Sequence, residues 1–159
     1  MRIRRATADD LETLALLRLA FIADVRQVDI ADLSPEFGAV TRAFLQDRFR
    51  AGRLHSWLAE EGPRPIGLVS VVVADGPPLP EEHRSLEGYV INMYVPPDAR
   101  GRGVARSLLD EVVARAPSFG FRRLYLYATD AGLPLYRNTG FTTDQRWMAL
   151  RLPLDSPDP

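Results

Sequence analysis

The stretch Arg100-Gly101-Arg102-Gly103-Val104-Ala105 decides how the rest of this sequence is interpreted. It follows an apolar run at residues 89–95 and opens a segment with helical spacing that ends near Ala116. A strand, a glycine loop and a helix in this order present backbone N–H groups to a phosphate. The glycines accept positive φ at little cost, and the arginines can add charge-assisted hydrogen bonds. The stretch therefore predicts an anion-binding loop, most simply one for a diphosphate.

The same loop has a simpler interpretation, a tight strand-to-helix turn with solvated arginines. Its spacing excludes two well-known phosphate loops. The Gly-x-x-x-x-Gly-Lys-Ser/Thr pattern of nucleoside triphosphate loops is absent. Arg106 stands where a dinucleotide fingerprint needs its third glycine. Taken alone, the loop leaves the choice between an anion site and a plain turn open.

A second segment narrows that choice. Residues 124–128 form an apolar run typical of a buried strand, and residues 129–132 interrupt it. A short helix is predicted over 133–139, ended by Gly140, and Phe141 starts a new strand. This strand, turn and helix come in the same order as the strand, glycine loop and helix around residues 89–116.

Together the two segments resemble the GCN5-related N-acetyltransferase superfamily. The acetyl-CoA loop of that family, Arg/Gln-x-x-Gly-x-Gly/Ala, is matched by Arg100, Gly103 and Ala105. Its later motif, Leu-Tyr-x-x-x-Gly-Phe, is matched by residues 135–136 and 140–141. The two matches stand in the family's order, and the resemblance is based on both.

The composition indicates one globular domain, expected over residues 1–152 with a frayed tail at 153–159. Hydrophobic residues make up 46% and charged residues 26% of the 159 positions, which is ordinary for a soluble protein. The formal net charge of −1 gives no global attraction to nucleic acid or to an anionic membrane. Cysteine is absent, so disulfides and thiolate nucleophiles are excluded. No apolar run is long enough to span a membrane, and a cytoplasmic protein is expected.

Periodicity predicts strands and helices of one α/β or α+β domain. Helices are expected over residues 8–25, 35–50, 104–116 and 133–139. Strands are expected over residues 3–6, 56–60, 66–74, 87–95, 123–128, 141–144 and 146–152. The resemblance implies how these elements pack, as a mixed, mostly antiparallel sheet of six to seven strands flanked by about four helices.

The resemblance also implies acetyl transfer from acetyl-CoA to an amine. In the family, backbone N–H groups of the glycine loop bind the CoA diphosphate, and the pantetheine arm lies against the preceding strand like an added strand. The cofactor-binding positions carried over are Met93, Val95, Arg100, Gly101, Arg102, Gly103, Val104 and Ala105. The family's Asn-x-x-Ala is replaced here by Thr129 and Gly132, so Thr129 or Asp130 is the candidate to bond the arm instead.

Two residues are candidates for catalysis. Tyr136 matches the family's tyrosine, whose phenol hydrogen-bonds or protonates the departing CoA thiolate; the alternative is a ring packed in the core with a solvated hydroxyl. The usual base position of the family falls on Tyr89, so Glu87, on the same strand face, is nominated to act through water. The alternative for Glu87 is an ordinary exposed residue at a strand start. Asn92 is expected on the opposite face unless a bulge re-aims it.

The leading hypothesis is an acetyl-CoA-dependent N-acetyltransferase that works by direct attack in a ternary complex, because no cysteine can hold the acetyl group. A non-catalytic acyl-CoA sensor on the same fold is the alternative, and the net charge disfavours a nucleic-acid-binding module. His55 and His83 lie in no metal-ligand cluster, so no metal is expected. The acceptor, a small-molecule or peptide amine, has no readable signature, and a homodimer is compatible with the fold.

Overall fold

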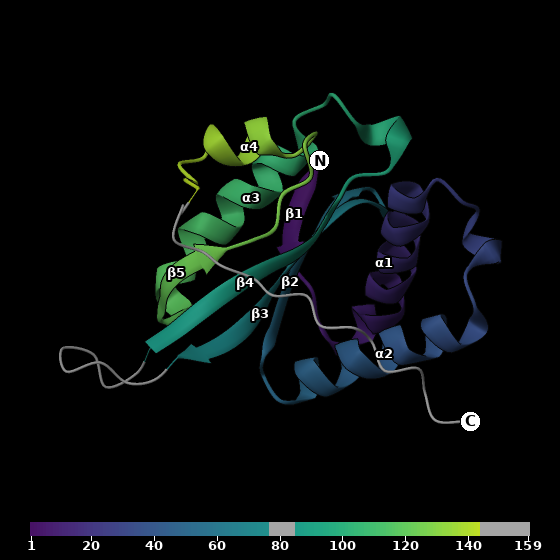
Figure 1. Cartoon of the computed structure of the whole chain (residues 1–159), viewed down its shortest axis with the longest axis horizontal. Helices are drawn as coiled ribbons and strands as arrows, with labels where there is room; N and C mark the ends of the chain where they lie inside the picture. Colours follow the sequence, from purple (N-terminus) through teal and green to yellow (C-terminus); the bar gives the residue numbers. More distant parts are fainter. Residues whose placement is uncertain (77–84, 144–159) are drawn as a thin grey trace.

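The computed structural model describes residues 1–76 and 85–143, and its centre is one sheet of five strands (Figure 1). The strands are β1 (Arg2–Arg5), β2 (Leu54–Glu61), β3 (Arg64–Gly76), β4 (Ser85–Tyr94) and β5 (Phe121–Tyr125). They lie side by side in sequence order. The first four strands pair antiparallel, whereas β5 runs parallel to β4. A parallel pair cannot be joined by a tight turn, so a crossover has to connect β4 to β5.

Helices cover both faces of this sheet (Figure 1). On one face lie α1 (Leu11–Arg26) and α2 (Pro35–Arg50), and on the other lie α3 (Val104–Arg115) and the short α4 (Leu133–Arg137). The crossover between β4 and β5 is α3. Short 3-10 turns stand at η1 (Ala8–Asp10), η2 (Ile30–Asp32), η3 (Pro97–Ala99) and η4 (Ala116–Phe119).

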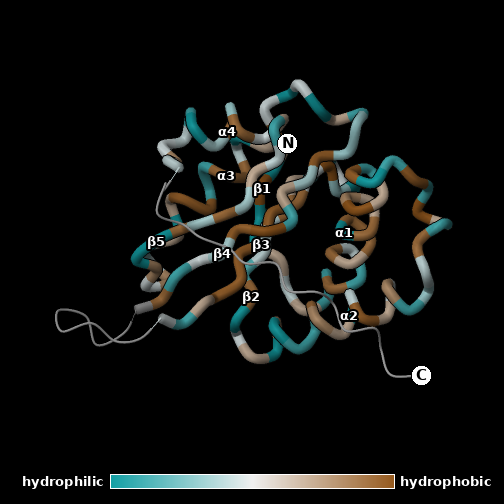
Figure 2. Tube along the Cα trace, in the orientation of Figure 1, coloured by the Kyte–Doolittle hydropathy of each residue, from teal (hydrophilic) through white to brown (hydrophobic). Residues whose placement is uncertain are grey.

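Two apolar cores result, one on each face of the sheet, and the central strands are accordingly brown in Figure 2. The core on the α3 side includes Ile66, Val69, Val71, Leu108 and Val112, and the core on the α1 side includes Leu14, Leu17, Leu45, Leu58 and Leu68. Gly67 lies where α3 meets β3: a Cβ there would stand 2.8 Å from Val104 Cγ1 and 3.0 Å from Leu108 Cδ1. The missing side chain therefore lets the start of α3 approach the sheet closely.

Local signals account for the helix ends that frame the site. α2 begins at Pro35 because the Ser34 hydroxyl accepts a hydrogen bond from the Phe37 N–H at 3.1 Å and proline suits the first helical turn. α1 ends where Gln27 takes a left-handed conformation, with φ +56°. The two helices contact each other on one face of the sheet, where α2 runs across the end of α1 (Figure 1).

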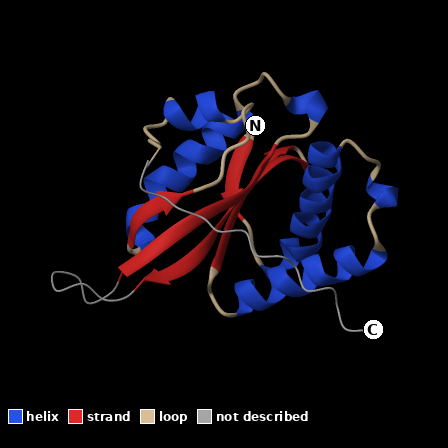
Figure 3. Cartoon of the chain, viewed as in Figure 1, coloured by secondary structure: helices blue, strands red, loops and turns tan. Residues whose placement is uncertain are grey.

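Most predicted elements are confirmed within a few residues, one is corrected in its bounds and two strands are not confirmed (Figure 3). The strand expected over 123–128 runs from Phe121 to Tyr125 instead, because its pairing with β4 ends there. The sixth and seventh strands are not confirmed: residues 141–143 form no strand, and the rest of the pair predicted over 141–144 and 146–152 lies outside the described residues, as does the tail at 153–159. The described sheet has five strands, and the four expected helices are present.

Candidate active site

The candidate site includes a bulge in β4. Leu68 of β3 faces Tyr94, but Ser70 faces Ile91, so Asn92 and Met93 together stand opposite one residue of β3. Asn92 has φ +55°, a left-handed conformation that asparagine accepts more readily than most residues. The bulge re-aims the Asn92 side chain, which is only 4% exposed, toward α1. The sequence had left this outcome open.

β4 and β5 separate shortly before the bulge. Their last paired residues are Tyr89 and Tyr125, and β4 continues to Tyr94 paired with β3 alone among the described residues. An extended group can add to such a free strand edge through its main-chain hydrogen bonds. A cavity of about 460 Å³ opens at this edge.

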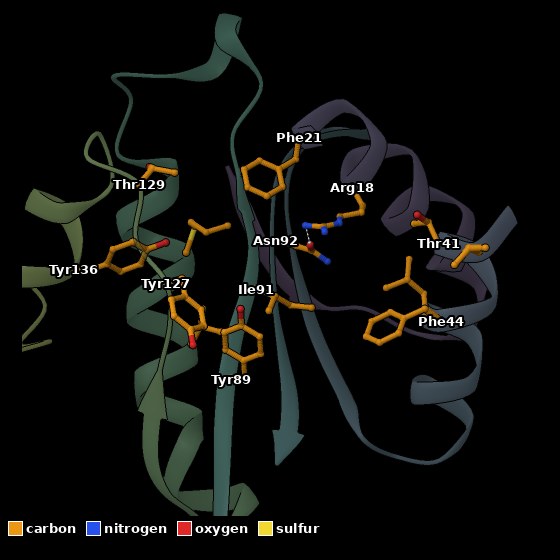
Figure 4. A pocket seen from close by; sticks show the side chains of 14 residues that line it. Arg18, Phe21, Thr41, Phe44, Tyr89, Ile91, Asn92, Tyr127, Thr129 and Tyr136 are labelled. Carbon is orange, nitrogen blue, oxygen red and sulfur yellow. Dashed lines mark hydrogen bonds between the residues drawn. The ribbon is translucent and has the colours of Figure 1, made fainter. Parts of the chain in front are cut away.

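The cavity is bounded by side chains from four parts of the fold (Figure 4). The residues labelled there are Arg18 and Phe21 of α1, Thr41 and Phe44 of α2, Tyr89, Ile91 and Asn92 of β4, and Tyr127, Thr129 and Tyr136 from the chain after β5. Among the described lining residues, Arg18 is the only charged side chain. The cavity is of the size that takes a small molecule.

Tyr136 of α4 lies at the cavity wall opposite α1 (Figure 4). Its side chain is nearly buried, and its ring meets the Phe141 ring edge-on at 5.8 Å between centroids. Within residues 1–76 and 85–143 its hydroxyl has no hydrogen-bond partner. Burial raises the pKa of the Tyr136 phenol, so the hydroxyl remains protonated at neutral pH. It is therefore a proton donor directed at the cavity.

The predicted anion loop has the geometry that its glycines suggested. Gly101 has φ +73° and Gly103, the N-cap of α3, has φ +77°, and space around both is open within 4 Å of an added Cβ. No side chain caps α3. The first N–H groups of a helix have no intrahelical acceptor, so they are available to an anion.

The two arginines of this loop are engaged by the protein. Arg100 donates from Nε to the Val95 carbonyl at 3.0 Å and from Nη2 to Asp24 at 2.5 Å. Arg102 forms an ion pair with Glu61. Their side chains therefore tie the loop to α1 and to β2, while main-chain groups face the open space.

Of the remaining predicted cofactor positions, two line the cavity. Met93 lines it and Val95 is partly buried at the end of β4. Thr129 lines it too, and its hydroxyl accepts from the Gly132 N–H at 3.3 Å in the turn before α4. Val104 is buried in the core, so only its backbone N–H can serve a ligand.

Glu87, the predicted base, does not line the cavity. Its carboxylate accepts from Arg123 at 2.9 Å and from Arg122 at 3.3 Å. The hydrogen bond from Arg123 is the main cause that holds the pKa of Glu87 below its usual value. A carboxylate with a lowered pKa is a weaker base, so these contacts weigh against Glu87, whose role stays a prediction.

Arg18 is the functional candidate that sequence analysis missed. Its Nη1 donates to the Asn92 side-chain oxygen at 2.8 Å, and its guanidinium lies 5.5 Å from the centre of the Phe21 ring. A signal was present in the sequence, because Arg18 stands four residues after Leu14 and three before Phe21, on the apolar face of α1. A charge on the buried stripe of a helix calls for an explanation.

Two general findings complete the description. Within residues 1–76 and 85–143, no group of three or more His, Cys, Asp or Glu side chains is arranged to hold a metal ion. In the same ranges, no helix is both long enough and apolar enough to cross a membrane.

The fold and the site define a class, the N-acetyltransferases, and solved structures share the architecture. A predicted acetyltransferase from Clostridium acetobutylicum, solved with acetyl-CoA, matches with a TM-score of 0.82 and 25% identity over 94% of this chain and 95% of that one. A GCN5-related N-acetyltransferase from Ralstonia eutropha JMP134 matches with a TM-score of 0.74 and 27% identity over 94% and 97% of the two chains.

Residues 22–141 match the acetyltransferase (GNAT) family, and the chain belongs to it. A glucosamine 6-phosphate N-acetyltransferase of Trypanosoma brucei brucei is 25% identical over 131 residues, which cover 82% of this chain and 78% of that protein. The resemblance drawn from the two sequence motifs is thus confirmed, and the protein is an N-acetyltransferase.

Proposed function

We propose that the protein transfers the acetyl group of acetyl-CoA to a primary amine by direct attack in a ternary complex. One observation carries this proposal: β4 and β5 part beside a cavity that has the anion loop near one end of β4 and the Tyr136 hydroxyl on its wall. A diphosphate carrier with an extended amide arm fits that arrangement. The use of acetyl-CoA by the family and by a similar solved structure supports it.

The chain offers a separate group for each part of acetyl-CoA. Backbone N–H groups of residues 101–105 would bind the diphosphate at the start of α3. The main chain of Met93 and Val95 would pair with the amides of the pantetheine arm, and Thr129 stands on the other side of the opening. Acetyl-CoA supplies an activated thioester when bound.

Tyr136 would act where the carbon–sulfur bond breaks. The amine nitrogen forms a bond to the carbonyl carbon, the sulfur leaves with the bonding electron pair, and the phenol donates a proton to it. The raised pKa of Tyr136 keeps that proton available throughout the neutral range. A nearby donor stabilises the leaving thiolate even before transfer is complete.

The proton that the attacking amine loses needs an acceptor, and Tyr136, which acts as a proton donor, does not supply one. The described lining of the cavity includes no carboxylate and no imidazole, and Glu87 is held by two arginines outside it. We infer that water accepts this proton.

The experiment is an acetylation screen in which release of CoA thiol is followed over a panel of amines. Glucosamine 6-phosphate belongs in the panel because a relative is named for it; amino acids and peptide N-termini complete it. We expect thiol release with at least one amine and none without acceptor. Tight acetyl-CoA binding by calorimetry without thiol release from any amine would favour the alternative, a non-catalytic acyl-CoA sensor. A cytoplasmic location and a homodimer stay predictions.

A further inference from the structure

Arg18 brings a positive charge into the acceptor side of the cavity, and no carboxylate of residues 1–76 and 85–143 balances it. Its described partners are an amide oxygen, on Asn92, and an aromatic ring, on Phe21. We propose that the acceptor amine carries an anionic group, a carboxylate or a phosphate, and that Arg18 binds it. This inference deepens the proposed function and rests on it.

The positive charge of Arg18 is not balanced by an acid of the described chain. A guanidinium that is taken out of water without an anion loses solvation that an amide and a ring only partly replace. Burial is accordingly the main influence on the Arg18 pKa, which lies below its ordinary value. The two other partly buried arginines of the described chain are paired with acids, Arg4 with Asp10 and Glu60 and Arg53 with Asp75. Arg18 is an exception in the described chain at the place where a ligand would bind.

The Arg18 side chain is also held in a fixed position in the cavity. Arg18 reaches the cavity from α1, and the bond from Nη1 to Asn92 fixes its orientation at 2.8 Å. A guanidinium has five N–H donors, so several remain for a ligand after that bond is made. Asn92 is itself fixed by the bulge, since it is buried and in a left-handed conformation. The cationic group is therefore held in place before any ligand arrives, which lowers the cost of binding.

The cavity also has different groups at its two sides. Arg18 and Tyr136 line the same space from opposite sides (Figure 4). An acceptor with an anion at one end and an amine at the other can place the anion on Arg18 and the amine toward the reacting sulfur beside Tyr136. An acceptor with several positive charges is disfavoured by the same guanidinium.

Matched acceptors test this inference, and one pair is needed for each anion. For phosphate we would compare glucosamine 6-phosphate with glucosamine, and for carboxylate β-alanine with propylamine. We expect kcat/KM to be about 10-fold or more higher for the anionic member of at least one pair, as expected for a charge-assisted hydrogen bond. In Arg18→Gln that ratio should fall close to one, because neutral amines lose little. The pair that responds identifies the anion.

Arg26→Gln is the matched control, because Arg26 lies on the same helix, is exposed and does not line the cavity. It should keep the wild-type ratio. Calorimetry with acetyl-CoA should give the same affinity in wild type and Arg18→Gln, which shows that the variant is folded and its cofactor side intact. Arg18→Lys, which keeps the charge without the fork of donors, should fall between the two.

The outcomes separate this inference from the proposed function. Equal turnover of anionic and neutral amines, or an equal loss of both in Arg18→Gln, overturns the role of Arg18 and leaves the N-acetyl transfer standing. Binding of an anionic amine that is seen by calorimetry and lost in Arg18→Gln, but without thiol release, supports the role of Arg18 and contradicts catalysis. A preference for polycationic amines in the wild type also contradicts the inference.

Discussion

The cavity is bordered by two walls that differ in the kinds of groups they offer a ligand. We call the β4 edge and α4, together with the loop 101–105 after β4, the cofactor wall, and the facing sides of α1 and α2 the acceptor wall; the loop itself lies outside the cavity lining. The cofactor wall offers main-chain groups and the phenols of Tyr89 and Tyr136, whereas the acceptor wall offers side chains such as Arg18 and Thr41. Main-chain recognition depends on backbone conformation, so a short glycine motif suffices for it. Recognition by side chains changes with each substitution, so we expect the acceptor wall to determine which amine is bound.

Arg4 and Arg18 differ in the same way, because the protein itself pairs one of them with acids and not the other. Arg4 donates to Asp10 at 2.7 Å and to Glu60 at 2.9 Å, and these hydrogen bonds, the one to Asp10 first, raise its pKa. Arg18 has an amide partner and a lowered pKa, with burial as the main cause. The first pairing joins β1, η1 and β2 and is complete within the protein. The second is incomplete, and a ligand can complete it.

The largest expected effect is on the cofactor wall. Gly103→Glu should abolish measurable acetyl-CoA binding, an increase in Kd of about 100-fold or more, because a carboxylate beside the helix start repels a diphosphate and φ +77° strains any side chain. Calorimetry measures this. Gly52→Glu is the control, since Gly52 also has positive φ, +67°, and open space but lies between α2 and β2. Normal acetyl-CoA affinity in Gly103→Glu would place the diphosphate elsewhere.

The next effect concerns the chemical step. Tyr136→Phe should lower kcat by about 10-fold or more and leave the acetyl-CoA Kd nearly unchanged, because the phenol acts mainly as the thiolate leaves. Steady-state thiol release gives kcat. Tyr125→Phe is the control: that ring stacks on Tyr89 at 5.0 Å and lies outside the cavity lining. An unchanged kcat in Tyr136→Phe would remove this residue from the mechanism.

A smaller effect is expected where the two walls meet, at Asn92. Asn92→Gly keeps the left-handed conformation but loses the oxygen that orients Arg18, so KM for the anionic acceptor should rise about 3- to 10-fold while kcat and acetyl-CoA affinity change little. Asn92→Ala should also lower the melting temperature, because alanine disfavours positive φ. If acetyl-CoA affinity falls and acceptor KM does not, Asn92 belongs to the cofactor wall instead.

The smallest effect lies away from both walls. His55 stacks on Phe119 at 4.1 Å and bonds Arg5 at 2.8 Å, and burial followed by the Arg5 charge lowers its pKa to about 4. The unfolded chain takes up this proton at the ordinary value of 6.5, so stability should be complete above that pH and decline as the pH falls from 6.5 toward about 4.

Thermal melting from pH 7 to pH 4 tests this for His55. His55→Phe keeps a ring against Phe119 but cannot take up a proton, so its melting temperature should fall less steeply over that range. Acetyl-CoA affinity and acceptor KM at pH 7 should match the wild type in this variant. Parallel pH profiles for the two proteins would mean that His55 is not the group responsible.

Features that depend on short local motifs could be predicted from the sequence, whereas contacts between distant side chains could not. The motif around Gly103 and the pair Leu135–Tyr136 identified the family, and the helix over 35–50 followed from Ser34, Pro35 and the apolar spacing. Arg18 was passed over because, in a single helix, one arginine among leucines is simply a break in an apolar stretch. Asn92 was expected on the opposite face unless a bulge re-aimed it, because side chains alternate along a strand and one inserted residue reverses that alternation.

The sequence by itself determined the order of the elements, the glycine loop that begins α3 and the tyrosine of α4, since these depend on local conformation and on short spacings. Only the tertiary structure decided that Arg18 and Asn92, 74 positions apart, meet at 2.8 Å, and that Glu87 is taken up by Arg122 and Arg123. Such contacts arise from how α1 crosses a bulged β4 and how β5 lies beside it. No spacing within one element encodes them.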